Sequence, residues 1–357
     1  MMENHKDILI VLDSYEYQIR EKEFASLLED MVQPHFFYSK YENSLTEKFA
    51  KTKYIGDFML HVSYWALSLL YACKLMGARY KRFDTIVFIN PIVGIFYSML
   101  CRLLYRNKNI TIGGFLFENK ASIIYYHVRK AFVNFCYKKV SKVFVYGDNE
   151  VAYYQSIFPE LKNKFEYVRY GRDFTYNKTK DFAYNNPYIA SGGRSNRKFE
   201  TLCDAMELIN QDGMNIDCLV ATRPECVNSK MQKSKVKFVY GITLNQFGSF
   251  IEHSVMFVLP LLNIKLSAGH MAMLEAMSKG KPVIVTDIPA IRDYVSENEV
   301  TFYNPDDATD LANKIRYIYK NLTSEDVESK RQKAMLLYNN EYSFKALLKR
   351  IVNQSIN

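Results

Sequence analysis

The 357-residue sequence lacks the features of a membrane-spanning, secreted or metal-binding chain. No stretch reaches the about 18–20 apolar residues that a membrane span needs. The nearest candidate, residues 58–73, is shorter and is interrupted by His61 and two serines. The start, MMENHKDILIVLD, has no basic segment followed by an apolar one, so we predict no signal peptide. The six cysteines are scattered without C-x-x-C or metal-finger spacing, which favours reduced thiols in a cytoplasmic protein.

Positive charge is concentrated in the first half of the chain. The net charge is +9; residues 1–180 hold 26 Lys and Arg against 18 Asp and Glu, and residues 181–357 hold 21 against 20. Such an excess favours an anionic partner: a membrane surface, an acidic acceptor or a nucleic acid. No nucleic-acid-binding motif accompanies the basic residues, so we do not expect nucleic acid. For any single basic cluster, a solvated helix face remains the simpler interpretation.

Strand-like and helical stretches alternate along the sequence. The strand-like runs are DILIVLD, TIVFINP, NITIGGFLF and KVFVYG in the first half, and YIASGGR, DCLVAT, VKFVYG, SVMFVLP and PVIVTD in the second. This alternation is typical of a parallel sheet with helices on both faces. The polar stretch 173–187 interrupts the alternation and is the best candidate for a linker. The sequence therefore predicts an α/β protein of two doubly wound, Rossmann-like domains, residues 1–180 and 181–340.

One mostly apolar helix carries a single acid. Residues 267–287, SAGHMAMLEAMSKGKPVIVTD, predict a helix that stops at Gly280 and Pro282 and leads into a buried strand. A helix that is apolar nearly all round lies inside a protein, where a carboxylate is costly unless something bonds it. Glu275 therefore needs a partner, either in the protein or on a ligand. At 100° per residue, Met271 lies on the same stripe as Glu275.

Loops at the predicted carboxyl ends of the strands carry groups suited to phosphate. Ligands of open α/β sheets bind at this edge. The segment SGGRSNRK provides Arg194 and Lys198, the positive charges that a pyrophosphate leaving group requires. The helix that follows Gly269 offers N–H groups and the positive end of its dipole, and His270 offers a further donor. Each signal is weak alone, and their order along the chain is the stronger evidence.

These segments resemble the GT-B glycosyltransferases, nearest to family 4, of which this chain looks like a divergent member. The resemblance spans residues 83–350 and is carried best by SGGRSNRKFETLCDAM and by FVLP…SAGHMAMLEAMSKGKPVIVTDIPAIRDYV. It implies two domains that face each other across a cleft. The closing stretch EYSFKALLKRIV resembles the last helix of that fold. The resemblance therefore implies that residues 341–357 pack back on the first domain, which would bind the acceptor.

The resemblance also implies roles for residues of the second domain. Arg194 and Lys198 would hold the diphosphate of a nucleotide-sugar. Glu275 would bind the ribose hydroxyls, so the partner of the lone acid would be a ligand. Tyr240 and Gly241 fall where the family contacts the base. The donor-binding set that we predict comprises Arg194, Lys198, Tyr240, Gly241, Lys265, Ser267, Gly269, His270, Met271 and Glu275.

The sequence departs from the family pattern at several positions. Ser267 stands where the family commonly has a second acid that touches the donor sugar. This departure leaves open an acidic sugar held by Lys265 or His270. In the first domain Asp13 and Glu118 are the candidates for contacting the acceptor or acting as base. No D-x-D triplet occurs, so we predict no metal and no cofactor, with charge stabilisation coming from Arg194, Lys198 and the helix end.

We therefore predict a cytoplasmic glycosyltransferase that moves a sugar from a nucleotide donor to a hydroxyl of a glycan or lipid-linked acceptor in surface polysaccharide synthesis. The basic, aromatic-rich first half makes peripheral association with an anionic membrane part of this prediction. A nucleotide-sugar 2-epimerase is the alternative within enzymology, and it would release free sugar without an acceptor. A catalytically inactive nucleotide-sugar-binding protein is the alternative from another class, and it would bind nucleotide without turnover.

Overall fold

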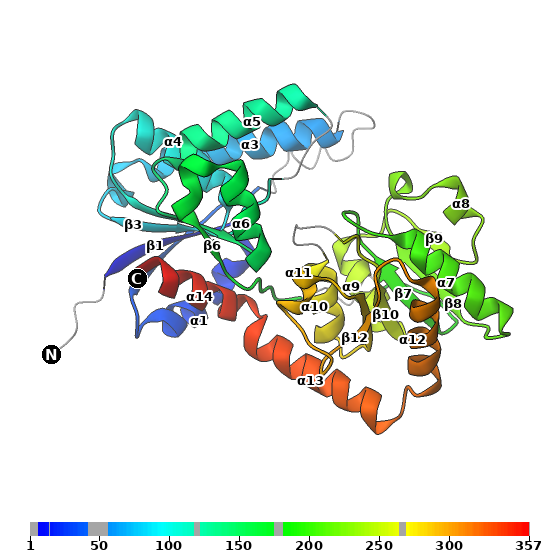
Figure 1. Ribbon diagram of the computed structural model, residues 1–357. Coiled ribbons are helices and arrows are strands. Elements are labelled where there is room, and N and C mark those ends of the chain that lie inside the picture. Colours follow the sequence, from blue (N-terminus) through cyan, green and yellow to red (C-terminus); the bar gives the residue numbers. More distant parts are fainter. Residues whose placement is uncertain are drawn as a thin grey trace. The chain divides into compact units, whose positions relative to one another are not determined.

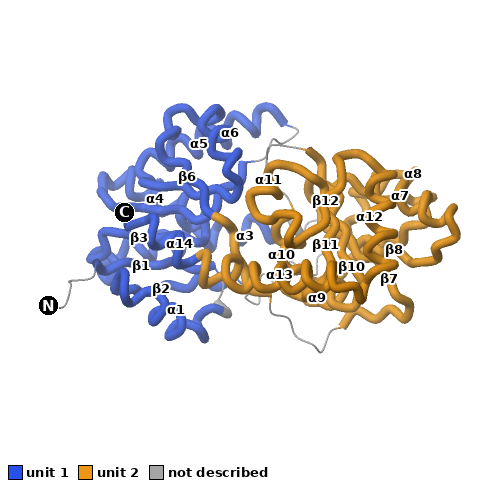
Figure 2. Tube along the Cα trace, turned by 60° about the horizontal axis from the view of Figure 1, so that its bottom comes forward, with its two compact units in different colours: residues 1–168, 348–357 blue, residues 169–347 orange. Residues whose placement is uncertain are grey.

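The chain forms two compact units, each described here by itself. The computed structural model describes residues 6–13, 15–41, 56–117, 122–174, 181–263 and 269–356. Unit 1 comprises Met1–Val168 and Leu348–Asn357, and unit 2 comprises Arg169–Leu347 (Figure 2).

Unit 1 contains a six-stranded parallel sheet in the order β2-β1-β3-β4-β5-β6. Its strands are β1 (Asp7–Leu12), β2 (Gln33–Tyr38), β3 (Thr85–Phe88), β4 (Asn109–Ile112), β5 (Lys142–Val145) and β6 (Phe165–Tyr167). The central strands are mostly apolar, and β3 is buried along its whole length. Such strands form when helices cover both faces of a sheet, because neither face then meets water.

Helices cover both faces of this sheet. They are α1 (Glu21–Leu28), α3 (Gly56–Leu75), α4 (Pro91–Leu103), α5 (Ile123–Tyr137), α6 (Asp148–Ile157) and α14 (Phe344–Ile356), of which the part from Leu348 belongs to unit 1. Figure 1 shows α3, α4 and α5 on one face, and α1 and α14 on the other. Asn109 donates to the Ser355 carbonyl at 3.2 Å, and Lys142 donates to the Gln354 carbonyl at 2.6 Å. No helix within the described ranges is long and apolar enough to cross a bilayer, α3 included.

Unit 2 repeats this architecture with the order β12-β11-β10-β7-β8-β9, again all parallel. Its strands are β7 (Tyr188–Gly192), β8 (Asp217–Ala221), β9 (Lys237–Val239), β10 (Met256–Leu259), β11 (Val283–Thr286) and β12 (Thr301–Tyr303). Its helices are α7 (Phe199–Gln211), α8 (Ser229–Gln232), α9 (Leu244–Glu252), α10 (His270–Ser278), α11 (Pro289–Arg292), α12 (Ala308–Lys320) and α13 (Glu325–Glu341).

Two apolar cores sandwich the sheet of unit 2. Tyr188 and Ala190 face a core that includes α9, α10 and α13, and Ile189 between them faces a core that includes α7 and α12. Successive side chains of a strand point to opposite faces, so each strand serves both cores. The result places α10, the helix with the lone acid, against the sheet as the sequence predicts.

In each sheet, the direction in which the chain adds new strands reverses once. In unit 1 the chain runs from β1 out to β2, then crosses to β3 on the other side of β1; in unit 2 it runs from β7 to β9, then crosses to β10 on the other side of β7. The two switch points therefore lie between β1 and β3 and between β7 and β10. The crevice beyond the carboxyl ends of the strands at a switch point is where doubly wound sheets bind ligands. The prediction of two doubly wound parallel sheets is confirmed.

Candidate functional site

The loops after β7 and β10 are joined by hydrogen bonds at the switch point of unit 2. The Lys198 amide donates to the Pro260 carbonyl at 3.0 Å, and the Leu262 amide donates to the Asn196 carbonyl at 3.1 Å. Between these two bonds, Arg197 and Leu261 form an isolated antiparallel bridge. The Arg-rich segment is therefore fixed beside the loop that leads into α10, and the structure brings these two parts of the predicted site together.

Gly269, directly before α10, has a conformation that other residues rarely adopt. Its φ is +82°, and an added Cβ would lie 2.9 Å from methyl carbons of both Leu259 and Leu261. No side chain caps the helix here. The first amides of α10 are thus presented at the switch point without a side-chain cap from the described residues, which is the arrangement of helix N-termini that bind anions.

Replacing Gly269 with Ala is expected to destabilise unit 2 by about 2–3 kcal/mol, because both the positive φ and the contacts with Leu259 and Leu261 are unfavourable. Gly213 is the matched control, since its φ is +78° and nothing lies within 4 Å of an added Cβ. Gly213→Ala should therefore lower the free energy of unfolding only by the cost of the positive φ, about 1 kcal/mol. Urea unfolding measures both losses. Equal losses for the two variants would show that the loop after β10 yields to the extra methyl group.

Glu275 is a partly buried acid without a fixed partner among the described residues. Within the described ranges its carboxylate makes no hydrogen bond or ion pair, and burial raises its pKa from 4.5 to about 7, against the weaker opposing charges of Lys279 and Arg172. The buried Glu150 of unit 1 shows the usual alternative, because its carboxylate accepts from the Tyr146 and Gly147 amides at 3.1 and 3.0 Å. Glu275 therefore keeps its hydrogen-bonding capacity for something outside the described protein groups.

His270 is buried at the start of α10 as a neutral ring. Its Nε2 lies 2.9 Å from the Ala290 carbonyl, and its ring centroid is 4.0 Å from that of Tyr294. Desolvation and, more weakly, the charge of Arg197 lower the pKa of His270 to about 4, against the opposing effect of the hydrogen bond to the Ala290 carbonyl. A carbonyl only accepts, so Nε2 carries the proton and Nδ1 is left as an acceptor. In this tautomer the ring offers no N–H to a ligand, and the donors at this helix end are backbone amides.

The three cations of the SGGRSNRK segment point in different directions. Arg194 is exposed. The Lys198 ammonium lies 3.6 Å from the Asp306 carboxylate, at the loop between β12 and α12. Arg197 instead turns inward: its guanidinium would collide with a Cβ added at Gly193. Our sequence interpretation did not single out Arg197.

Arg197 is held against the loop by its own backbone. Its Nε donates to the Gly192 carbonyl at 2.9 Å, and Nη1 donates to the Ser195 carbonyl at 2.6 Å. Burial lowers the pKa of Arg197 to about 10, so it remains charged at neutral pH. Its charge acts on His270, which begins α10. Among the described cations of the SGGRSNRK segment, Arg197 is therefore the one whose charge reaches the start of α10. The sequence signal for it was only that it belongs to the same basic segment.

The remaining predicted residues of unit 2 are more spread out. Tyr240 is 43% exposed and Gly241 has a φ of +72° in open surroundings, both after the edge strand β9. Strands β7 and β8 lie between β9 and β10 in the sheet, and α9, which begins at Leu244 just after these two residues, contacts α10. Met271 is 44% exposed in the first turn of α10. Lys265 and Ser267 lie outside the described residues.

Polar residues also gather at the switch point of unit 1. Asp13 is exposed directly after β1, and its charge raises the pKa of Tyr64, which burial raises more strongly. Asn90, directly before α4, donates to the hydroxyls of Tyr41 and Tyr64 at 2.7 and 3.2 Å. Asp13 therefore lies where this sheet would bind a ligand. Glu118 falls outside the described residues.

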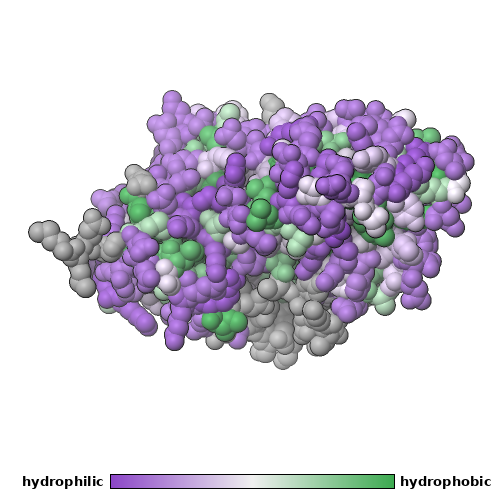
Figure 3. Space-filling view, turned by 90° about the horizontal axis from the view of Figure 1, so that it is seen from below, coloured by the Kyte–Doolittle hydropathy of each residue, from purple (hydrophilic) through white to green (hydrophobic). Residues whose placement is uncertain are grey.

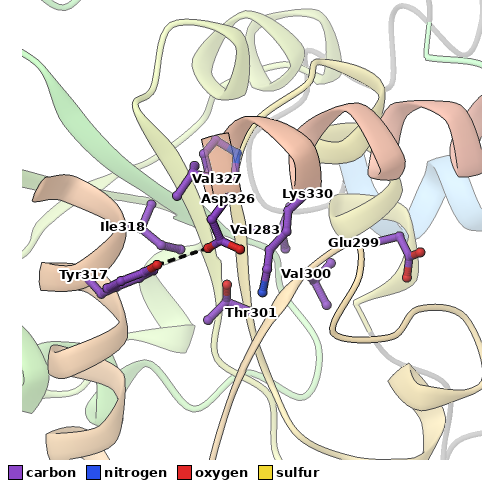
Figure 4. A pocket seen from close by; sticks show the side chains of 10 residues that line it. Val283, Glu299, Val300, Thr301, Tyr317, Ile318, Asp326, Val327 and Lys330 are labelled. Carbon is purple, nitrogen blue, oxygen red and sulfur yellow. Dashed lines mark hydrogen bonds between the residues drawn. The ribbon is translucent and has the colours of Figure 1, made fainter. Parts of the chain in front are cut away.

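A shallow pocket in unit 2 lies at the wrong edge for a nucleotide. It is lined by residues at the amino ends of β11 and β12 and by residues of α12 and α13, and Tyr317 donates to Asp326 there at 3.1 Å (Figure 4). Ligands of doubly wound sheets bind at the opposite, carboxyl edge. The Tyr317–Asp326 bond links two helices, and we assign it a structural role.

Comparison with known families matches the second half of the chain. Residues 186–321 match the model of the family described as glycosyl transferases group 1. This stretch begins before β7 and ends after α12, so it includes the Arg-rich segment, the α10 N-terminus and Glu275. No curated protein matches the chain.

Solved structures match over the whole chain. A glycosyltransferase from Rickettsia africae has a TM-score of 0.60 at 15% identity, with 99% of this chain and 98% of that chain covered. Sucrose-phosphate synthase from Thermosynechococcus elongatus has a TM-score of 0.61 at 14% identity, with 98% of each chain covered. The Anabaena protein HepE, solved with UDP-glucose, has a TM-score of 0.60 at 11% identity, with 98% of this chain and 99% of that chain covered. The fold is shared, and the resemblance to GT-B glycosyltransferases is confirmed.

Proposed function

From the fold of the GT-B glycosyltransferases and the group 1 match of residues 186–321, we propose that this chain is a glycosyltransferase. It moves a sugar from a nucleotide-diphosphate-sugar to a hydroxyl of a glycan or lipid-linked acceptor, in the synthesis of a surface polysaccharide. The observation that carries the proposal is the combination at one switch point of an uncapped helix N-terminus, a charged guanidinium and an acid that no described protein group bonds. The UDP-glucose complex of the Anabaena relative supports the donor class.

Each group has a distinct role in this proposal. The α10 amides and the cations of the SGGRSNRK segment stabilise the diphosphate as it leaves, which is the largest electrostatic requirement of the reaction. Glu275 accepts hydrogen bonds from the ribose hydroxyls. Asp13, at the switch point of unit 1, contacts the acceptor or takes its proton. No metal or cofactor takes part, because the fixed positive groups meet the charge of the leaving group.

A thermal-shift panel of nucleoside diphosphates and their sugars tests the donor site. A ligand at 100 times its Kd should stabilise the wild-type protein by about 2.7 kcal/mol, which is a shift of several degrees in Tm. Arg194→Ala should reduce that shift. The donor that binds is then supplied with and without extracted membrane lipid and glycan. Transfer to an acceptor is expected, whereas free sugar without acceptor would identify an epimerase and binding without turnover an inactive receptor. A flat response to the whole panel would refute the donor site.

A further inference from the structure

Helix α5 of unit 1 has an apolar stripe on its solvent side. Ile124, Val128, Ala131 and Phe135 follow one another at spacings of four, three and four residues, which places them on one line along the helix. Ile124 is 77% exposed, Val128 61% and Phe135 37%, and Ala131 is also exposed. The opposite side of α5 is buried through Val133, Cys136 and Tyr137. An amphipathic helix normally needs only that buried side to be apolar, so the outer stripe has no role in the fold.

Helices α4 and α3 also expose apolar side chains. Helix α4 packs between α3 and α5 (Figure 1). At its end Leu103 and Leu104 are 54% and 56% exposed, and Tyr105 is 90% exposed with a φ of +52°. On α3, Trp65 and Leu70 are 42% and 63% exposed. We call these residues and the stripe of α5 the outer face of unit 1. The side seen from below in Figure 3 is instead mainly hydrophilic, with apolar residues in small separate groups.

The outer face is also basic. Helices α4 and α5 carry Arg102, Arg129 and Lys130 and no Asp or Glu. The cations lie among the aromatic side chains: the Arg102 guanidinium is 4.0 Å from the centroid of the Phe135 ring, and that of Arg129 is 5.4 Å from the Tyr125 ring. Apolar, aromatic and basic side chains on one face are the composition of surfaces that lie in a lipid–water interface.

Charge decides between the classes of occupant. A second copy of this chain would bring two basic faces together without acids to pair them, which is unfavourable. An anionic bilayer supplies negative head groups for the cations and an apolar layer for the stripe at the same time. We propose that the outer face docks on an anionic lipid bilayer and lies in its interface, with α5 parallel to the membrane plane. This inference deepens the proposed function, because a lipid-linked acceptor would be met there, and lipid binding is measured without catalysis.

Flotation with phosphatidylcholine vesicles, with and without phosphatidylglycerol, tests the docking. The wild-type protein should float with the anionic vesicles only, and high salt should reduce the floating fraction. The double variant Ile124→Gln/Val128→Gln, which changes two exposed positions and so should fold, is expected to lower vesicle affinity on the order of tenfold. The matched control is Ile19→Gln/Leu336→Gln, which removes two exposed apolar side chains that are 89% and 61% exposed outside the outer face, and it should float like the wild type.

Three results would overturn the proposal: no flotation of the wild type, equal flotation of the α5 variant, or a dimer in solution that the α5 variant converts to a monomer. The last would make the outer face an interface between copies of the chain. The thermal response of the α5 variant to nucleotide is measured in parallel. It should match the wild type, so a failed donor site and a failed membrane surface give different patterns.

Discussion

Glu275→Gln is expected to stabilise the ligand-free protein above pH 7 and to weaken nucleotide-sugar binding by about 10–100-fold. The two effects have opposite signs because the acid has no hydrogen-bond or ion-pair partner among the described protein groups but has one, in our proposal, on the ligand. A structural acid would lose stability on the same change. A residue that lowers the stability of the ligand-free protein but strengthens ligand binding is one retained for function.

The pKa of Glu275 gives the sign of the stability effect. Burial raises this pKa from 4.5 to about 7, so between these values the folded protein holds a proton that the unfolded chain has released. The stabilising contribution of that proton is complete below pH 4.5 and is lost as the pH rises through 7. At pH 8 the buried charge costs about 1–3 kcal/mol, which a neutral Gln avoids. Thermal unfolding at pH 5 and pH 8 should therefore show a gain in Tm for the variant at pH 8 only.

Binding should show the opposite dependence on pH. Ribose hydroxyls donate to the charged carboxylate, so the affinity of the wild type should rise by about tenfold between pH 6 and pH 8. The affinity of Glu275→Gln should not change over this range. A nucleotide-sugar is the proper probe, because a free nucleoside diphosphate has a terminal phosphate that titrates near pH 6. Calorimetric titration at several pH values measures both affinities.

Glu150→Gln is the matched control for a buried acid. The Glu150 carboxylate accepts two backbone amides at the start of α6, so its replacement should lower the Tm at both pH values and leave nucleotide-sugar binding unchanged. If Glu275→Gln also lowers the Tm at pH 8 and binds nucleotide-sugar like the wild type, Glu275 is a structural residue and the ribose assignment fails.

The doubly wound sheets could be predicted from the sequence, because strands buried on both faces consist mostly of consecutive apolar residues. Glu275 could be singled out for a related reason, since a single charged side chain in an otherwise apolar helix is costly to bury without a partner. The strand order could not be predicted, because hydrophobic periodicity records burial and not which strands are neighbours. The switch points, and with them the edge that joins the loop of Arg197 to that of Gly269, required the structure.

The choice between adjacent cations could not be made from the sequence either. Arg197 and Lys198 are consecutive, and the sequence does not state how the chain turns before them. In the structure Asn196 has a φ of +59°, in the left-handed region, and after this turn Arg197 points inward while Lys198 reaches Asp306. The outer face of unit 1 could not be predicted for a similar reason. The apolar spacing of α5 is typical of a helix, but it does not show which side of that helix faces the core.

Arg197→Met is expected to weaken binding of the nucleoside diphosphate by about 100-fold and to lower turnover by about 100–1000-fold, with little effect on the nucleoside alone. The structural reason is that Arg197 is the described cation of the SGGRSNRK segment whose charge reaches the start of α10, and the carbonyls of Gly192 and Ser195 hold it with Nη2 left for a phosphate. Lys198→Met should weaken binding of the nucleoside diphosphate by less than tenfold, because the Lys198 ammonium pairs with Asp306. Competition binding with nucleoside and nucleoside diphosphate measures the contrast.

Arg331→Met separates a loss of charge at the site from a general loss of packing. Arg331 also donates from Nε to a glycine carbonyl, that of Gly280, but it does so at the opposite end of α10. Its replacement should therefore lower the Tm much as Arg197→Met does, while leaving the affinity for the nucleoside diphosphate unchanged. Arg197→Lys keeps a charge without the planar fork and should fall between the wild type and Arg197→Met. A larger loss of affinity for Lys198→Met than for Arg197→Met would instead make Lys198 a diphosphate cation, as the sequence predicts for it together with Arg194. The inward guanidinium of Arg197 would then serve only to hold the loop after β7.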